Sequence, residues 1–152
     1  MLTYPRETVL GNLFALLQSV TFSVPVCGKS TFSIVSRKLV HWSTVSRADR
    51  PALFMTTHSE TPVYRKENLP AYLQIKLRLF VYTDGQGSTG VPDSDQSVVL
   101  DAIDSALSAP GSGVQTLGST VSHCRIDGEV VRDPGDLDGD GVIIIPVTIA
   151  LT

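Results

Sequence analysis

This chain of 152 residues is 42% apolar and 18% charged, which is the composition of a single globular domain that can bury a real core. Its net charge of −3 argues against a free nucleic-acid-binding protein, whose binding face needs a basic surplus. The longest aliphatic run, at positions 142–145, is much shorter than the roughly 20 residues of a membrane span, so no membrane insertion is expected.

The charge is distributed unevenly along the chain. Residues 1–80 contain ten Lys and Arg against four Asp and Glu, whereas residues 81–152 contain two against eleven. Two interpretations stay open. Folding interleaves the two halves so that their fields largely cancel, or the subunit is bipolar and its basic side meets the acidic side of a neighbour.

The first predicted element is an amphipathic helix over residues 5–20. Proline is favoured in the first turn of a helix and acidic residues follow it well, so Pro5 and Glu7 fit such a start. The helical spacing is carried by Val9, Leu10, Leu13, Phe14, Leu17 and Val20. One side of this helix is therefore expected to pack on a sheet.

Residues 21–31 mix Ser, Val, Pro and Gly and predict a loop. The sequence CGKS at positions 27–30 resembles the end of a phosphate-binding P-loop. That motif needs a glycine five positions before Gly28, where this chain has Ser23, and it follows a strand, whereas here a helix precedes it. A nucleotide site is therefore not expected.

The next part of the chain predicts strands. Residues 32–45 are β-rich with imperfect alternation, which predicts a strand with a bend or bulge. A polar turn at 47–51 ends in Pro51, and a short apolar strand at 52–57 follows it. Residues 58–70 hold two prolines and a charged run, which predicts an exposed connection.

The clearest signal is a long strand over residues 73–83. One face would consist of Leu73, Ile75, Leu77, Leu79 and Val81, and the other of Gln74, Lys76, Arg78, Phe80 and Tyr82. The first set must meet a core. The second set combines two cations with two aromatic rings, which suits either a solvated sheet or a contact surface.

A second helix is expected after a Gly-rich loop at 84–93 that has the composition of a flexible segment. Asp93 and Gln96 have the spacing of a capping box. The apolar stripe consists of Val99, Leu100, Ile103, Ala106 and Leu107, and Pro110 and Gly111 end the helix. Asp101 and Asp104 share its outer side, where a solvated face is favoured over paired catalytic or metal-binding carboxylates.

Residues 114–131 predict a strand with glycine interruptions. His123 and Cys124 are neighbours on it and would point to opposite faces, which argues against a shared metal ion or a catalytic pair. Cys27 and Cys124 have neither metal-site spacing nor the density of a disulfide framework. A reducing cytoplasmic environment is therefore expected.

A possible calcium loop lies near the C-terminus. Asp136, Asp138, Asp140 and the glycine after them match the first positions of such a loop. The twelfth position, which should be a bidentate Glu, is Val147. These carboxylates are therefore weak metal candidates, and a hairpin turn is favoured.

The last strand is predicted over residues 142–151. Pro146 places it at an edge of the sheet or beside a bulge, and an apolar edge needs a cover that a neighbouring subunit would supply. The order of elements predicts one α+β domain over residues 1–152, with a mostly antiparallel or mixed sheet and two helices packed on one face. No catalytic constellation and no cofactor motif is found, so neither an enzyme nor a cofactor is expected.

Five stretches resemble the tail terminator (minor tail) proteins of long-tailed bacteriophages. They are LFALLQSVTFS, SRKLVHWSTVSRADRPALFM, IKLRLFVYTDG, LDAIDSALSAPGSGVQTLGSTVSHCRIDGEV and DGDGVIIIPVTIAL, in this order along nearly the whole chain. The resemblance implies an α+β subunit of a six-membered ring that caps the tail tube and ends its polymerisation. The family has no motif that names single functional residues.

The same resemblance implies the partners and the location. The partners would be other copies of the chain, the tail tube protein, and a head-side connector or head-completion protein. The genome would pass through the lumen without sequence-specific contacts, and no membrane would be involved. The protein would be found in the virion tail after assembly in the host cytoplasm.

The charge pattern predicts which residues such a ring would use. The basic contacts would be Arg37, Lys38, Arg47, Arg50, Lys76 and Arg78, and the acidic ones across the subunit boundary Asp133, Asp136, Asp138 and Asp140. Reversal of Arg47 and Arg50 to Glu is expected to weaken assembly but leave the monomer folded. Two alternatives stay open: a monomeric adaptor that binds through the Lys76, Arg78, Phe80 and Tyr82 face, and a small calcium-binding module.

Overall fold

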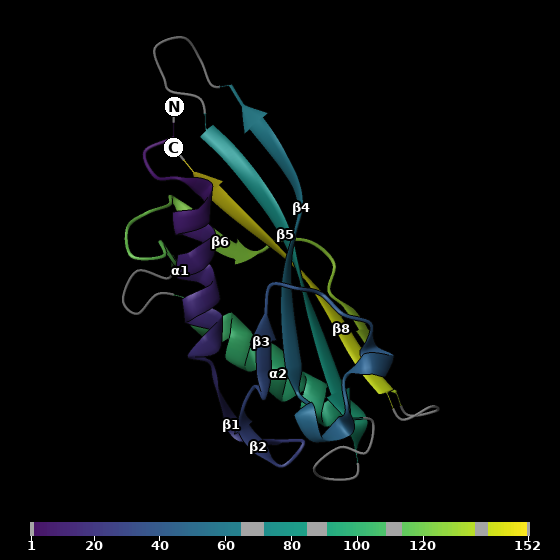
Figure 1. Cartoon of the computed structure of the whole chain (residues 1–152). Coiled ribbons are helices and arrows are strands. Elements are labelled where there is room, and N and C mark those ends of the chain that lie inside the picture. Colours follow the sequence, from purple (N-terminus) through teal and green to yellow (C-terminus); the bar gives the residue numbers. More distant parts are fainter. Residues whose placement is uncertain (1, 65–71, 85–90, 109–113, 136–139, 152) are drawn as a thin grey trace.

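The computed structural model describes residues 2–64, 72–84, 91–108, 114–135 and 140–151. In these residues two helices pack on one face of a curled, mixed and mostly antiparallel sheet (Figure 1). This is the α+β fold that the sequence predicts. None of the described helices has the length and apolar character needed to cross a membrane.

The main sheet has six strands. Five follow the order β3 (Ile34–Ser36), β4 (Ala52–Val63), β5 (Tyr72–Asp84), β8 (Asp140–Leu151) and β6 (His123–Ile126), and the sixth, β7 (Val131–Asp133), also pairs with β8. β3 runs parallel to β4, and the other pairs are antiparallel. The helices are α1 (Arg6–Gln18) and α2 (Pro92–Ala106). Between β3 and β4 lie two short 3₁₀ turns, η1 (Trp42–Thr44) and η2 (Arg47–Asp49).

The core lies between the sheet and the two helices. The five alternating residues of β5 predicted to be inside, from Leu73 to Val81, are all buried there. The helices contribute Val9, Leu10, Leu13, Leu17, Val99, Ile103 and Leu107. Burial of each such aliphatic side chain contributes about 1.5–3 kcal/mol, so this layer supplies most of the stability. The long strand and both helices predicted from the sequence are confirmed.

The start of α2 differs from the predicted capping box. Neither Asp93 nor the N-cap residue Val91 caps the helix with its side chain. Gln96 is fully buried, and its Nε2 donates to the carbonyl oxygens of Asp133 (2.6 Å) and Val142 (3.3 Å). Gln96 therefore joins α2 to β7 and β8, because a buried amide needs partners wherever it lies.

The predicted loop at 21–31 is wrong, because these residues form the hairpin of β1 (Thr21–Val26) and β2 (Lys29–Thr31). At its tip Cys27 and Gly28 have φ angles of 51° and 76°. Two consecutive positive φ angles are the requirement of a tight two-residue hairpin turn, which Gly28 meets without steric cost. The segment resembling a P-loop is therefore a hairpin tip that opens no helix.

Three other predicted boundaries shift. The strand expected over 32–45 is limited to β3, and η1 follows it. The connection expected from residue 58 is wrong as far as Val63, because β4 continues through a bulge and pairs with β5 to that point. The strand expected over 114–131 is two short strands, β6 and β7. The predictions for 85–90 and 110–111 lie outside the described residues.

The last strand is not an edge strand, because β8 lies between β5 and the pair β6 and β7. The bulge alternative fits Pro146 better: β6 ends opposite Val147, β7 begins opposite Ile144, and the chain between them leaves the ladder beside Pro146. The carbonyl of Pro146 accepts from the Asp127 N–H on that side (3.0 Å). A neighbouring subunit is therefore not needed to cover this strand.

The outer face of the sheet, opposite the helices, carries a second and smaller core at one end. Buried there are Val45, Ala52, Phe54 and Tyr82, with Phe80 and Val142 packed against them. The rings of Phe54 and Tyr82 lie 5.2 Å apart. Residues 37–50, which include both 3₁₀ turns, contribute to this core. We call these residues the cover segment.

Candidate interaction surface

The six basic residues predicted for a subunit contact fall into two groups. Four belong to the cover segment, and the other two, Lys76 and Arg78, lie on β5 beyond it. Lys38 and Arg47 are exposed, and among the described residues neither makes an ion pair.

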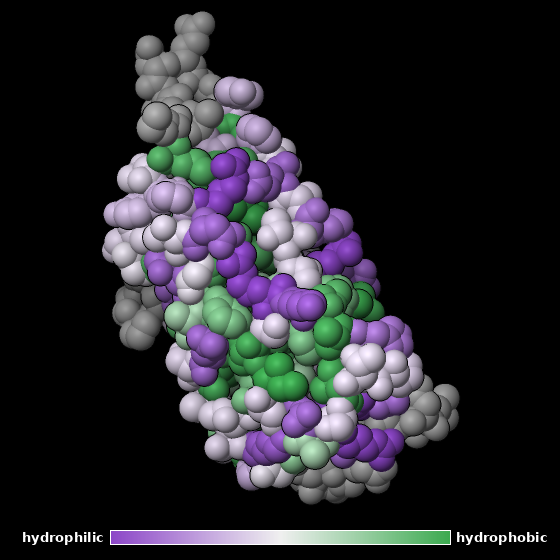
Figure 2. All heavy atoms as spheres, viewed as in Figure 1, coloured by the Kyte–Doolittle hydropathy of each residue, from purple (hydrophilic) through white to green (hydrophobic). Residues whose placement is uncertain are grey.

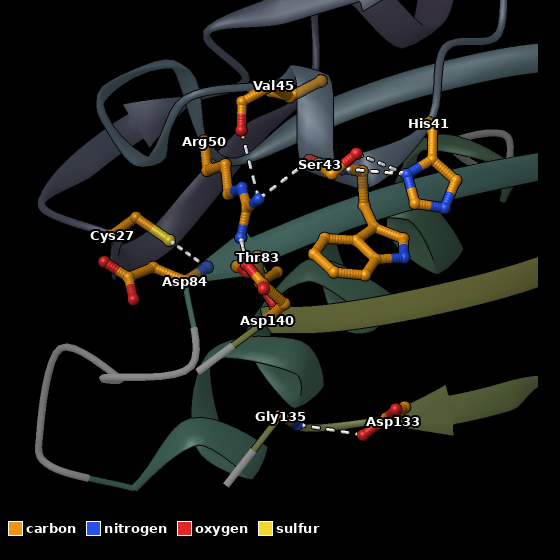
Figure 3. Close-up of polar contacts among 11 residues, drawn as sticks. Cys27, His41, Ser43, Val45, Arg50, Thr83, Asp84, Asp133, Gly135 and Asp140 are labelled. Atoms are coloured by element: carbon orange, nitrogen blue, oxygen red, sulfur yellow. Dashed lines mark hydrogen bonds and ion pairs between the residues drawn. The ribbon is translucent and has the colours of Figure 1, made fainter. Parts of the chain in front are cut away.

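Arg50 is buried, with only 3% of its side chain exposed (Figure 3). Its guanidinium pairs with the Asp140 carboxylate and donates to the carbonyl oxygens of Thr83 (3.2 Å), Trp42 (3.0 Å) and Val45 (3.1 Å). The planar guanidinium can satisfy several oxygens at once. Arg50 thus fastens the cover segment to the ends of β5 and β8.

This placement corrects the role predicted for Arg50. A buried guanidinium with its partners inside the chain is not available to a neighbouring subunit. Reversal of Arg50 to Glu would place a carboxylate beside Asp140 in a buried site and destabilise the monomer, so the predicted test on Arg47 and Arg50 together cannot separate assembly from folding.

Arg37 is also paired within the chain. It donates two hydrogen bonds to the Glu7 carboxylate of α1, at 2.7 and 3.1 Å. These bonds and the positive charge lower the pKa of Glu7 below its ordinary value. Both side chains are accessible to water, so the pair joins the start of the cover segment to α1 only weakly.

The predicted acidic residues divide in a similar way. Asp136 and Asp138 lie outside the described residues. Asp140 is the partner of Arg50, and Asp133 accepts a hydrogen bond from the Gly135 N–H (3.0 Å). The part of the chain that the structure describes contains no group of three side chains able to hold a metal ion. The calcium hypothesis therefore gains no support from Asp140.

Beyond the cover segment the outer face of the sheet carries a row of polar residues. Lys76 on β5 is paired with Thr148 on β8, and Thr148 is paired with Arg125 on β6. Directly paired residues point to the same side, so all three side chains leave the same face of the sheet. Arg78 lies two residues further along β5 and also points to this side. Thr148 itself is buried, so we call the surface of the exposed Lys76, Arg78 and Arg125 the open face.

The spacing of the open face follows from sheet geometry. Strands are about 4.8 Å apart, so the backbones of Lys76 and Arg125, two strands apart, are separated by about 10 Å. Lys76 and Arg78 are about 7 Å apart along one strand. Three basic side chains therefore share a small area. Within the described residues, no carboxylate lies at ion-pair distance from any of them.

The open face is hollowed where β4, β5 and β8 meet the turn after β6. The hollow has a volume of about 400 Å³, and its walls include His58, Asp127, Pro146 and residues of the open face. His58 Nε2 lies 3.3 Å from an Arg78 Nη atom. Asp127 is the acidic group at its rim. The hollow can accept side chains that carry a negative charge.

Arg125 and His58 belong to this surface although the sequence pattern did not predict them there. The pattern within β6 does not place Arg125 beside Lys76, because each of the two is aligned with Thr148 on a third strand, β8. The predicted Phe80 and Tyr82, by contrast, do not belong to it. Both lie under the cover segment, and the Tyr82 hydroxyl donates to the carbonyl of Val40 (2.5 Å).

The far side of the molecule has the opposite charge. Asp101 and Asp104 are exposed on the side of α2 that points away from the core. α2 contains no Lys or Arg, and its other exposed carboxylate, Asp93, is paired with Arg132 (2.7 Å). We call the exposed side of α2, with Asp101 and Asp104, the acidic face. The prediction of a solvent-facing pair is confirmed.

The cysteines are unsuited to nucleophilic chemistry at neutral pH. Burial raises the pKa of Cys124 to about 12 and also raises the pKa of Cys27. The Cys27 Sγ accepts a hydrogen bond from the Asp84 N–H (3.3 Å; Figure 3). His123 and Cys124 lie on opposite faces of β6, as predicted. Both thiols are therefore mainly protonated packing groups.

An apolar area is visible on another side of the molecule. Figure 2 shows it over β3 and the chain that follows β3. The apolar residues of this part of the chain that are at least partly exposed are Ile34, Val35, Leu39, Val40 and Trp42. Leu39 is 41% exposed and Trp42 is 37% exposed. Leu39, Val40 and Trp42 of this area belong to the cover segment, and none of the five residues belongs to the open face.

No family model matches the chain, and no curated protein matches it. Its function is therefore inferred from its own residues and their arrangement.

Proposed function

We propose that this chain is a structural subunit of a homo-oligomeric ring, of the tail-terminator kind, that caps the tail tube of a long-tailed bacteriophage. The observation that carries the proposal is the open face: three cations on a regular sheet surface that the described chain leaves without ionic partners. Such a surface suits contact with a partner of opposite charge, and a second copy in an assembly would supply one.

Two further observations agree with this function. The five stretches that resemble tail terminators extend along nearly the whole chain, and the α+β fold is the one that the resemblance implies. The ring would end polymerisation of the tail tube, meet the head-side connector and let the genome pass through its lumen.

The test is the mass of the protein in solution. Light scattering on a sizing column, over a wide range of concentration and salt, is expected to find a species of about six times 16.3 kDa at low salt, and negative-stain images should show it as a ring. Isolated tail tubes supply a template where the ring needs one. A protein that is monomeric alone and does not bind the ends of tail tubes would contradict the proposal and favour the monomeric adaptor.

A further inference from the structure

We propose that the open face is the docking surface for the acidic face of a second copy of this chain. Asp101 and Asp104 of one copy would lie against Lys76, Arg78 and Arg125 of the next. This inference rests on the proposed ring and names the surfaces that join its subunits. Of the partners predicted from the sequence, Arg50 and Asp140 are left out, because they are already paired with each other within the chain.

The two surfaces lie on opposite sides of the molecule. α2 packs on the inner face of the sheet through Val99 and Ile103, so the exposed Asp101 and Asp104 point away from the sheet on that side. Lys76 and its neighbours leave the other face of the sheet. A two-fold dimer through either surface would bring like charges together. The contact must therefore be head-to-tail, which is the arrangement that generates rings.

The spacing of the charges also agrees. Residues three apart on a helix have Cβ atoms about 5–6 Å apart, and alternate residues on a strand are about 7 Å apart. Asp101 and Asp104 therefore match Lys76 and Arg78 in separation. Beside Asp101 a groove of about 420 Å³ runs between α2 and β1, with Ser105, Thr21 and Ser23 in its walls. It has room for the end of a long basic side chain and hydroxyls to bind it.

A second copy fits the open face better than a nucleic acid does. The chain as a whole carries a charge of −3, which repels a polyanion at long range. The same net charge does not prevent a bipolar subunit from stacking head-to-tail. Because the charges on both faces are exposed in the free subunit, the contact is expected to weaken as salt rises.

Paired charge reversals test this directly. Variant A is Lys76→Glu with Arg78→Glu, and variant B is Asp101→Lys with Asp104→Lys. All four residues are exposed, so both variants should fold, which circular dichroism and thermal melting would verify. Each variant alone is expected to associate at least about tenfold more weakly than the wild type, because its two faces now carry the same sign.

Mixing the variants gives the decisive result. Variant A then presents two acidic faces and variant B two basic faces, so an equimolar mixture should assemble with the copies alternating, and light scattering should recover the wild-type mass. If the wild type is monomeric at accessible concentrations, titration calorimetry of A into B at low salt measures the same contact. The control variant Lys38→Glu with Arg47→Glu should assemble like the wild type.

The outcomes are distinguishable. Wild-type assembly by A and by B separately, or a mixture that does not associate, would overturn the docking surface. Rings formed by both single variants would leave the proposed function standing, whereas alternating filaments without closure would support the docking surface and count against the ring. If variant A assembles normally but loses binding to a DNA duplex, the open face binds a polyanion and this proposal fails.

Discussion

The outer face of the sheet has two halves that differ in composition and in whether the chain covers them. One half is apolar, with Phe54, Phe80 and Tyr82, and the cover segment encloses it. The other half carries Lys76, Arg78 and Arg125 and stays open. β5 runs through both, and its outward residues change from Lys and Arg to Phe and Tyr between positions 78 and 80. The composition of one strand thus marks the border between surface closed within the subunit and surface available to another molecule.

The basic side chains of the two halves differ in burial and in pairing. In the covered half a single cation, Arg50, is buried and receives four oxygen acceptors from its own chain. In the open half three cations remain in water, and no carboxylate of the described residues lies at ion-pair distance from them. A buried charge needs partners inside the protein, whereas water stabilises an exposed charge that has no ionic partner. We infer that Arg50 stabilises the fold and that the cations of the open face serve association.

The largest effect on stability is expected from Arg50→Ala. Removal of the guanidinium leaves the Asp140 carboxylate and three carbonyl oxygens without their donor, which should lower the free energy of unfolding by about 3–5 kcal/mol. Urea unfolding measures this loss. Arg47→Ala, on an exposed residue three positions away, is the matched control and should change stability by less than about 0.5 kcal/mol. Equal losses in the two variants would show that Arg50 does not fasten the cover segment.

A smaller loss is expected from Tyr82→Phe. This change removes the hydroxyl that donates to the carbonyl of Val40 and keeps the ring in the second core, so the loss should be about 1 kcal/mol. Tyr4→Phe, at a tyrosine that is 39% exposed, provides the comparison and should be close to neutral. If Tyr82→Phe is equally neutral, the cover segment is held without this bond.

Glu7→Gln should have a slight effect that depends on pH. Arg37 lowers the pKa of Glu7 in the folded chain, so the folded state binds this proton less tightly than the unfolded state. The stabilisation is therefore present at neutral pH and disappears as the pH falls through the folded pKa. Thermal melts should show the variant slightly less stable than the wild type at pH 7 and equal to it in acid. An equal difference at both pH values would contradict this linkage.

The open face should be neutral for folding. Lys76→Gln and Arg78→Gln remove charges that have no ionic partner in the described chain, so each should change the free energy of unfolding by less than about 0.5 kcal/mol in the free subunit. Urea unfolding at low protein concentration gives this value. A loss as large as that of Arg50→Ala would make the open face a structural element and remove the contrast between the two halves.

The core residues were predicted well because the spacing of apolar residues can be read within a single segment of the sequence. The alternation from Leu73 to Val81 and the stripes of both helices are readable without knowledge of any partner strand. The hairpin of β1 and β2 was missed because Pro25 and several serines resemble a loop, although Cys27 and Gly28 at its tip suit a tight turn. Strand ends were also misplaced, since β4 is extended by its pairing with β5.

The candidate surface was only half predictable. Lys76 and Arg78 could be assigned to one face from alternation alone. Arg125 joins them only through the register of β6 on β8 and of β8 on β5, which local pattern does not encode. Arg50 was misassigned for a related reason: its partners, Asp140 and Thr83, are far away in the sequence, and a charged residue in a polar turn is usually exposed.

The most direct test of the account is the reactivity of two lysines toward acetylation as the protein assembles. Lys76 lies on the open face and Lys38 in the cover segment, and both are exposed in the subunit. Mass spectrometry of protein acetylated over a range of concentrations should show Lys76 becoming protected as the mass in solution rises, while Lys38 stays reactive. Protection of Lys38 alone, or of neither lysine in an assembled species, would show that the open face is not where the copies meet.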